Sequence, residues 1–205
     1  MIAMMARRPE RGDRRPPGSV RIIGGRWRGR RLPVAEAEGL RPTTDRIRET
    51  LFNWLRPYLA GSRVADLFAG TGILGIEALS RGAASALFVE QDRRLARGIE
   101  RRLETLGAGG CRVLAADAYR LLAGGEPEPF DVVFLDPPYG HGRLDELCKL
   151  LADRGWLADD ALLYLEHDRR SPPRLPPGLE PRREKTAGNV RFVLLERTEP
   201  TGGAL

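Results

Sequence analysis

Short apolar runs alternate with amphipathic segments along most of the chain after residue 63. The runs "RVADLF", "ALFVE", "CRVLAAD", "FDVVFLD" and "ALLYLE" are rich in Val, Leu and Phe, which is typical of buried strands. Between them, "ILGIEALSRG", "RRLARGIERRLETLG" and "RLDELCKLLAD" carry apolar residues at helical spacing. Gly82 and Gly107 mark the expected ends of the first two helices. This alternation predicts an open, mostly parallel sheet with helices on both faces.

Two further segments precede the alternating region, and one follows it. "SVRIIGGRWRGRRLPV" predicts a short β-hairpin that turns at two glycines. "LRPTTDRIRETLFNWLRPYL" predicts an amphipathic helix that begins near Thr43, Thr44 and Asp45. Its apolar positions at helical spacing are Ile47, Leu51, Trp54, Leu55 and Tyr58. "RREKTAGNVRFVLLE" predicts a closing antiparallel hairpin.

Together these elements predict a single α/β domain over residues 19–205. Its centre is a Rossmann-like, seven-stranded, mostly parallel sheet that ends in an antiparallel hairpin, with a small N-terminal β-hairpin at residues 19–35. Residues 1–18 are rich in Arg, Pro and Gly and have little to bury, so they are expected to form a disordered arm.

Arginine is concentrated at the amino end of the chain. Ten arginines against two acidic residues give residues 1–31 a net charge of +8, so the rest of the chain is −2 within the total of +6. Basic charge confined to one end favours a polyanion partner, above all nucleic acid, over a merely solvated tail. The hairpin residues expected to bind RNA are Arg21, Arg26, Trp27, Arg28, Arg30 and Arg31. For Trp27 the alternative is a packing role in the core.

Composition limits the setting further. No apolar run approaches the ~20 residues needed to span a bilayer, and the N-terminus is too charged for a signal peptide. Cys111 and Cys148 lack metal or redox spacing and are expected to be small buried side chains in a reducing compartment. We therefore expect a monomeric cytoplasmic protein with no membrane contact.

Carboxylates end four of the expected strands. They are Asp66, Glu90, Asp117 and Asp136, and the glycines Gly70, Gly72 and Gly75 follow the first of them. In an open α/β sheet the carboxyl ends of the strands share one edge, where ligands bind. A lone acid at a strand end is most often only a solvated charge. Four in order predict a binding site.

The glycines match the dinucleotide-binding fingerprint, with Glu90 close to the offset of its ribose-binding acid. The charge of Asp66 would oppose a pyrophosphate placed at this loop. S-adenosylmethionine fits better, because it carries an ammonium group, a positive sulfonium and a ribose diol. Glu90 can accept hydrogen bonds from the ribose hydroxyls and Asp117 from the adenine amino group. Phe68, Ala69, Gly70, Gly72, Ala118 and Asp136 are expected to line the same cofactor pocket.

The segment "FLDPPYG" follows the fourth strand. Two consecutive prolines fix the backbone and leave its carbonyl groups free to accept hydrogen bonds. Asp136 and the Pro137 carbonyl can then accept from an exocyclic amino group and localise its lone pair for an in-line methyl transfer. Pro138 stiffens the segment, and Tyr139 offers a ring on which an unstacked base can lie. Guanine suits Asp136, because it presents two donors to one carboxylate. The reaction needs no metal.

These motifs resemble those of a known family. "DLFAGTG" is similar to motif I of class I S-adenosylmethionine-dependent methyltransferases, and "DPPY" to motif IV of those that methylate base amino groups. "RIIGGRWRGRRLPV", "GLRPTTDRIRETLFNWL" and "REKTAGNVRF" resemble the RsmD family of small-subunit (16S) rRNA guanine-N(2)-methyltransferases. The resemblance spans residues 20–197. "DPPY" alone is shared with DNA and protein-amide methyltransferases, whereas the second block is far more specific.

The resemblance implies methyl transfer from S-adenosylmethionine to the 2-amino group of a guanine in small-subunit rRNA, with S-adenosylhomocysteine as the product. It implies that the block with Thr43, Thr44 and Arg46 helps bind the methionine end of the cofactor; helix capping is the alternative. His141 either contacts RNA or is incidental.

Three other functions compete with this prediction. A DNA amino-methyltransferase would normally carry a target-recognition segment, for which the chain has little room. A nicotinamide dehydrogenase would account for the glycines but not for Asp66 or "DPPY". A non-catalytic rRNA-binding assembly module would account for the arm but not for the ordered acids. The target nucleotide stays open, as does the choice between naked rRNA and an assembling subunit as substrate.

Overall fold

The computed structural model describes residues 18–33, 45–137 and 143–198. The predicted arm, apart from its last residue, lies outside these ranges, as do the Thr43–Thr44 cap and His141. Of the helices that the structure describes, none is both long enough and apolar enough to cross a bilayer.

The described elements follow the predicted alternation. The strands are β1 (Ser19–Arg21), β2 (Arg31–Pro33), β3 (Arg63–Asp66), β4 (Ser85–Val89), β5 (Cys111–Leu114), β6 (Phe130–Leu135), β7 (Leu157–Asp168), β8 (Leu179–Ala187) and β9 (Val190–Arg197). The helices are α1 (Asp45–Leu55), α2 (Ile73–Ser80), α3 (Arg93–Leu106), α4 (Ala118–Gly124) and α5 (Leu144–Asp153), with 3-10 turns η1 (Gly25–Trp27) and η2 (Arg56–Tyr58).

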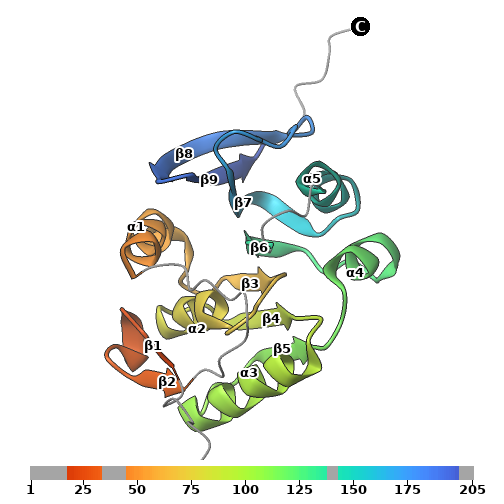
Figure 1. Ribbon diagram of the computed structural model, residues 1–205. Coiled ribbons are helices and arrows are strands. Elements are labelled where there is room, and N and C mark those ends of the chain that lie inside the picture. Colours follow the sequence, from red (N-terminus) through yellow and green to blue (C-terminus); the bar gives the residue numbers. More distant parts are fainter. Residues whose placement is uncertain (1–17, 34–44, 138–142, 199–205) are drawn as a thin grey trace, which may run out of the picture.

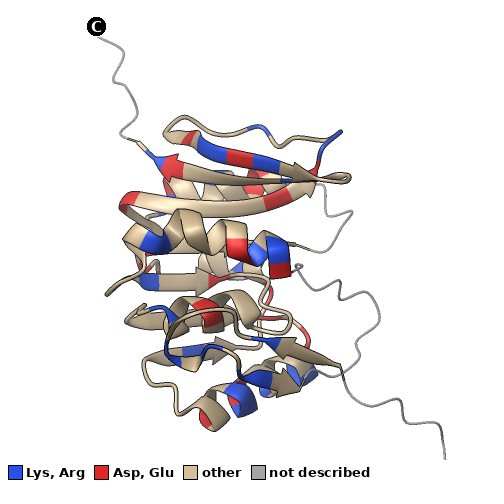
Figure 2. Cartoon of the chain, turned by 90° about the vertical axis from the view of Figure 1, so that its left-hand side faces the viewer, with Lys and Arg blue, Asp and Glu red and all other residues tan. Residues whose placement is uncertain are grey.

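Seven strands form one sheet in the order β5-β4-β3-β6-β7-β9-β8, and β1 and β2 form a separate antiparallel pair (Figure 1). Strand β3 pairs in parallel with both β4 and β6, while β9 is antiparallel to β7 and β8. In the view turned by 90°, the strands run across the molecule one above another (Figure 2). The strand order therefore reverses at β3, which is where open α/β sheets bind their ligands. The predicted fold class is confirmed.

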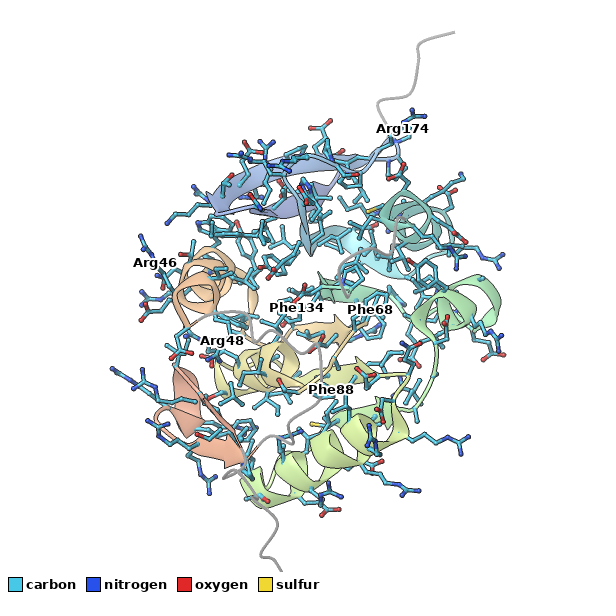
Figure 3. The ribbon with its side chains drawn as sticks, viewed as in Figure 1. Arg46, Arg48, Phe68, Phe88, Phe134 and Arg174 are labelled. Carbon is cyan, nitrogen blue, oxygen red and sulfur yellow. The ribbon has the colours of Figure 1, made fainter. Side chains whose placement is uncertain are left out.

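Two apolar clusters hold the layers together, one on each face of the sheet. Helices α1, α2 and α3 and the β1–β2 hairpin pack on one face, and α4 and α5 pack on the other (Figure 1). Every residue of α2 is buried, because this helix lies between the sheet and the hairpin. Helix α2 approaches the sheet closely at Gly75, where an added Cβ would lie 2.3 Å from Cε1 of Phe88. The labelled Phe88 and Phe134 mark the central strands in Figure 3.

Three elements differ from the sequence prediction. Helix α4 was not predicted, because its seven residues are too few to show a clear apolar period. Strand β7 starts at Leu157 rather than near residue 161, and its pairing with β6 shifts register between Phe130 and Val132. Tyr58 is 37% exposed, because Pro57 ends the helical hydrogen bonding and turns the chain into η2.

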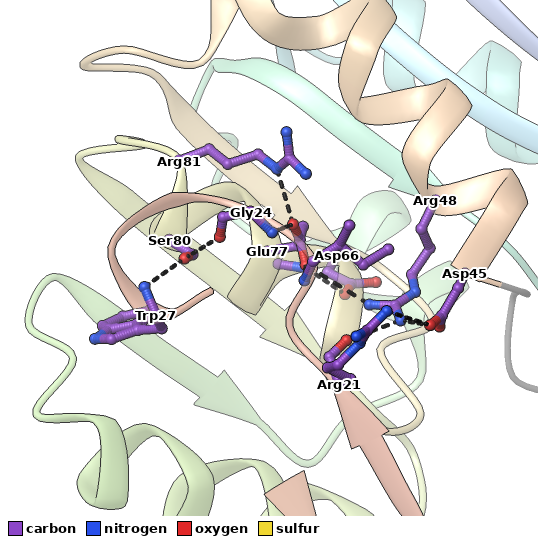
Figure 4. Close-up of polar contacts among 11 residues, drawn as sticks. Arg21, Gly24, Trp27, Asp45, Arg48, Asp66, Glu77, Ser80 and Arg81 are labelled. Atoms are coloured by element: carbon purple, nitrogen blue, oxygen red, sulfur yellow. Dashed lines mark hydrogen bonds and ion pairs between the residues drawn. The ribbon is translucent and has the colours of Figure 1, made fainter. Parts of the chain in front are cut away.

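A buried carboxylate in α2 anchors the N-terminal hairpin. Glu77 is fully buried, and its two oxygens accept hydrogen bonds from the backbone amides of Ile23 (2.8 Å) and Gly24 (2.7 Å) (Figure 4). One turn further along α2, Ser80 accepts from the Trp27 amide at 3.0 Å and donates to the Gly24 carbonyl at 2.6 Å. The turn between β1 and β2 is therefore bonded to α2 through side chains.

Arg48 of α1 joins the same cluster. Its guanidinium is fully buried, donates to the Arg21 carbonyl at 2.9 Å and to Asp45 at 2.6 Å, and lies 3.6 Å from Glu77. Its Nε and Nη1 atoms have no hydrogen-bond partner among the described residues. The charges of Arg48 and Glu77 therefore depend on each other, because neither is solvated.

Removing one charge of this buried pair should be strongly destabilising. We expect Glu77→Gln to lower the free energy of unfolding by ~3–5 kcal/mol, because it leaves the buried Arg48 with only the exposed Asp45 as a counter-charge. Urea unfolding measures the change, with Glu104→Gln on the exposed side of α3 as a control of little effect. A double variant with Arg48→Met should cost less than the sum of the two single changes. Simple additivity would show that the pair is not coupled.

Candidate active site

The four predicted acids gather at the carboxyl edge of the sheet. Asp66 is the last residue of β3 and pairs in register with Phe134 of β6. Glu90 follows β4 directly, and Asp136 follows β6. Asp117 is the residue that caps α4, just beyond β5. The sequence therefore placed all four at the correct edge, around the point where the strand order reverses.

Glu90 shapes the glycine loop. Its carboxylate accepts hydrogen bonds from the amides of Gly70 and Asp92, both at 2.8 Å. Gly70 and Gly72 have φ values of 51° and 75°, a left-handed conformation that favours glycine. Each carboxylate oxygen still has a lone pair beyond these two bonds. Glu90 can therefore hold the loop and also accept from a ligand.

Asp66 is a buried carboxyl group with no basic neighbour acting on it among the described residues. Its side chain is 2% exposed and accepts a hydrogen bond from the Gly75 amide at 3.1 Å. Burial raises the pKa of Asp66 to about 7; the Gly75 bond opposes this rise, and the charge of Glu90 adds to it. Within the described ranges, no basic side chain contributes to the shift. A cation placed beside Asp66 would restore its ionised form.

Asp117 has a structural task that the sequence did not predict. Its Oδ1 accepts from the Arg120 amide at 2.9 Å and caps α4. The next residue, Ala118, is buried. Asp117 therefore fixes the start of α4, which borders the candidate site.

An aromatic wall connects the glycine loop to α4. The rings of Phe68 and Tyr119 meet edge to face with centroids 6.2 Å apart, and the Arg143 guanidinium lies 4.0 Å from the centre of the Tyr119 ring. The Tyr119 side chain is 8% exposed, and its hydroxyl has no hydrogen-bond partner among the described residues. Figure 3 shows Phe68 beside the ends of the central strands. Neither Tyr119 nor Arg143 was singled out in the sequence.

The expected methyl-acceptor side is described in part. Asp136 and Pro137 are half-buried at the end of β6, and Pro138 and Tyr139 lie outside the described residues. Arg46 is exposed and points away from the sheet in Figure 3. The structure therefore does not bring Arg46 to the strand-end acids.

The hairpin presents its arginines to solvent and its tryptophan to the core. Arg21, Arg26, Arg28, Arg30 and Arg31 are all exposed. Trp27 is 7% exposed, and the Arg26 guanidinium lies 4.1 Å from the centre of its ring. The ring is thus already covered, so stacking on a base is the wrong role for it and the core alternative holds.

The polar residues that position these elements escaped the sequence prediction. Arg102 of α3 is 6% exposed and donates to the carbonyls of Pro33 (2.9 Å) and Thr71 (3.2 Å), which joins the end of β2 to the glycine loop. Arg48 and Glu77 are likewise buried charged residues that join elements. The sequence indicated them only by a charged residue at a helical core position: Arg48 one turn before Leu51, and Glu77 within an otherwise apolar helix.

Comparison with known proteins places the chain among methyltransferases. A family model described as "Conserved hypothetical protein 95" matches residues 20–196. The "Ribosomal RNA small subunit methyltransferase D" of Escherichia coli K12 is 49% identical over 181 residues, which cover 88% of this chain and 91% of that protein. The "Putative rRNA methyltransferase YlbH" of Bacillus subtilis is 40% identical over 153 residues, covering 73% and 83%.

Solved structures agree with these relatives. A structure described as "Putative methyltransferase yhhF from Escherichia coli" superposes with a TM-score of 0.83 at 47% identity and covers 88% of this chain and 98% of that chain. A putative methylase from Haemophilus influenzae gives a TM-score of 0.77 at 39% identity, covering 89% and 100%. The matched residues include both the hairpin and the strand-end acids, and the chain therefore belongs to the RsmD family of ribosomal RNA small subunit methyltransferases, as its motifs predicted.

Proposed function

We propose that the protein transfers a methyl group from S-adenosylmethionine to the exocyclic 2-amino group of a guanine in small-subunit ribosomal RNA. The observation that carries the proposal is the set of carboxylates at the carboxyl edge, with buried Asp66 among them. Relatives named as small-subunit rRNA methyltransferases support the substrate class. The choice of guanine rests on the donor pattern that a single carboxylate recognises.

The donor and acceptor chemistry of the site fits the cofactor. The charge of the neighbouring Glu90 raises the pKa of Asp66, and the described residues offer Asp66 no counter-charge. An ammonium group at Asp66 would supply that counter-charge, and Glu90 would accept from ribose hydroxyls. Asp117 and the Phe68–Tyr119 wall would hold the adenine. When bound, the cofactor supplies an electrophilic methyl group on a positively charged sulfur.

The protein's own part in the chemistry is to hold the acceptor nitrogen. Asp136 lies half-buried at the end of β6 and precedes a proline, so its backbone is restricted to an extended conformation. Its carboxylate and the Pro137 carbonyl would accept the two amino hydrogens and leave the nitrogen lone pair directed away from the guanine ring. The proton that the nitrogen must lose leaves toward the carboxylate. Acceptors that are fixed before the base arrives need no reorganisation during the reaction.

The nicotinamide alternative is disfavoured by the same geometry. A pyrophosphate at the glycine loop would stand beside Asp66 and Glu90, whose carboxylates accept from the first turn of α2 and from the loop amide of Gly70. Two carboxylates would repel the diphosphate, whereas they attract a cationic ligand. The exposed hairpin arginines give the proposed enzyme a surface for the phosphates of its RNA substrate.

Asp66→Asn should weaken cofactor binding and remove its pH dependence. The substitution removes a charged partner worth ~1.5–3 kcal/mol, about a ten- to hundredfold loss of affinity. In the wild type, affinity should rise as the pH passes upward through about 7, because Asp66 ionises there and only the ionised form attracts an ammonium group. Calorimetry with S-adenosylhomocysteine at several pH values measures both effects, with NAD as the control ligand. Unchanged affinity in the variant, or tight binding of NAD, would contradict the assignment.

The same substitution should change how stability depends on pH without any ligand. The pKa of Asp66 rises from 3.8 to about 7 on folding, so its favourable contribution is complete below the lower value and lost as the pH rises through the higher one. Relative to Asp66→Asn, the wild type should therefore lose on the order of 4 kcal/mol of unfolding free energy across that interval. Urea unfolding of both proteins between about pH 4 and about pH 8 tests this. Parallel curves would show that Asp66 stays ionised in the folded protein.

Asp136→Ala should reduce turnover while leaving the cofactor in place. We expect methyl transfer to fall by about two orders of magnitude or more, because the lost acceptor acts mainly as the amino group reacts. The measurement is single-turnover transfer of labelled methyl groups to rRNA, together with S-adenosylhomocysteine affinity. Asp131→Ala is the matched control, because Asp131 lies near the opposite end of β6 and accepts from the Arg63 amide. A variant at 136 with near-normal turnover would refute the acceptor role.

A further inference from the structure

We propose that helix α3 carries a second RNA-binding surface, formed by Arg93, Arg97 and Arg101, whose Arg93 end lies at the active-site edge. The proposal rests on the proposed function, because it assigns the surface to the same RNA substrate. The three arginines are spaced by four residues and therefore lie on one side of the helix, with a rise of ~6 Å from each to the next. We call them the α3 stripe.

The stripe is open to solvent. All three residues are exposed, and within the described part of the chain none of them forms an ion pair. Their neighbour Arg94 differs, because it pairs with Asp92, the residue that caps the helix. The guanidinium groups of the stripe are therefore available for phosphate oxygens, which guanidinium binds in a two-pronged geometry.

The positions of the stripe arginines do not favour the stability of helix α3. The first turn of α3 has no acidic residue and its last turn no basic residue, which is the reverse of what the helix dipole favours. Arg93 with Arg97, and Arg97 with Arg101, are like-charge pairs at a spacing of four, and such pairs destabilise a helix. Arg101 also helps burial to lower the pKa of Arg102. The like-charge pairs cost stability, which Glu100 and Glu104, three residues after Arg97 and Arg101, offset only in part. An anionic partner would offset the rest.

The position of α3 connects the stripe to both the site and the hairpin. The helix begins at Asp92, whose amide donates to Glu90 at 2.8 Å, so the Arg93 end lies at the carboxyl edge of the sheet. On the other side of α3, Arg102 donates to the carbonyl of Pro33 at the end of β2. The hairpin and α3 are thus bonded to each other, and the stripe lies on the solvent side of the helix, away from this contact. Figure 2 shows basic residues of the hairpin and α3 close together at the lower end of the molecule.

The acidic residues of α3 lie toward the end of the helix that is away from the active-site edge. Glu100 and Glu104 are exposed on the same helix, but they lie in its second half, away from the active-site edge. Of the stripe, Arg93 and Arg97 lie in the acid-free first half, beside Glu90 and the glycine loop, whereas Arg101 lies in the second half next to Glu100. An RNA strand whose target base enters the site would have its phosphates near this basic half, and electrostatic contact of this kind is not sequence-specific.

The test replaces the stripe by neutral side chains of similar shape. The variant Arg93→Gln, Arg97→Gln, Arg101→Gln removes three charges and keeps good helix formers. The matched control, Arg169→Gln, Arg170→Gln, Arg183→Gln, also removes three charges from exposed positions. Arg169 and Arg170 directly follow β7 and Arg183 lies on β8, all in the half of the sheet away from the strands next to α3. Binding of transcribed small-subunit rRNA is titrated with salt for both variants and the wild type.

The stripe variant should bind the rRNA more weakly, with a slope of log affinity against log salt flatter by about 2, since each phosphate contact to a single strand contributes ~0.7. The control should keep the wild-type slope. The melting temperature of the stripe variant should be equal or higher, because its like-charge repulsions are gone, and S-adenosylhomocysteine affinity should be unchanged.

Two results would overturn the inference. One is a stripe variant with the wild-type slope and affinity; the other is an equal loss in both variants, which would reduce the effect to net charge. If either occurs while the wild type still binds the cofactor and methylates rRNA, only the stripe falls. If the wild type binds neither S-adenosylhomocysteine nor rRNA, the proposed function falls, and the inference falls with it.

Discussion

The buried carboxylate of Glu77 is the contact on which the N-terminal half of the structure depends. It accepts from two backbone amides of the hairpin, pairs with Arg81 on its own helix and faces the buried Arg48 of α1. A carboxylate taken out of water is costly unless its oxygens are fully used. Here they are used by three different elements, so the hairpin, α1 and α2 are held in one arrangement. A basic hairpin of two three-residue strands could not keep a fixed position without such an anchor.

The acids of the candidate active site also bind backbone amides. Glu90 holds the glycine loop, Asp66 accepts from the first turn of α2, and Asp117 caps α4. Each therefore orients backbone before any ligand arrives. A site built in this way is preorganised, because the same hydrogen bonds that fold the loops also fix the direction of the carboxylates. Asp66 is fixed in direction but not in charge. Burial raises its pKa to about 7, so its charge at neutral pH depends on what binds beside it.

The surface proposed for RNA and the loop proposed for the cofactor lie on elements that contact each other. Arg102 spans from the end of β2 to the glycine loop, and α3 carries exposed arginines on one side and core leucines on the other. The surface proposed for RNA and the loop proposed for the cofactor therefore share a helix. A displacement of the RNA surface or of the glycine loop can be transmitted to the other through packed side chains, since protein interiors are close-packed.

Much of this protein follows from its sequence alone. Most of the alternation of strands and helices, the closing hairpin, the end of α3 at Gly107 and the strand-end positions of Asp66, Glu90 and Asp136 were predicted correctly. Asp117 lies at the predicted edge but caps α4, because β5 ends at Leu114. These features depend on local periodicity, on glycine at left-handed positions and on the rule that parallel strands share a carboxyl edge, and all three are visible in short stretches. The motif blocks identified the family for the same reason.

Only the tertiary structure decided which polar and aromatic side chains are buried. Trp27 lies in the core although its neighbours are exposed arginines, and Tyr58 is exposed although its spacing suits the core. Glu77 meets its amide partners 53 and 54 residues away along the chain, and Arg102 meets Pro33 69 residues away. A charge can be buried only when such distant groups arrive to bind it. The protonation of Asp66 has the same origin, because the pKa of a carboxyl group depends on the low-dielectric surroundings that folding builds around it.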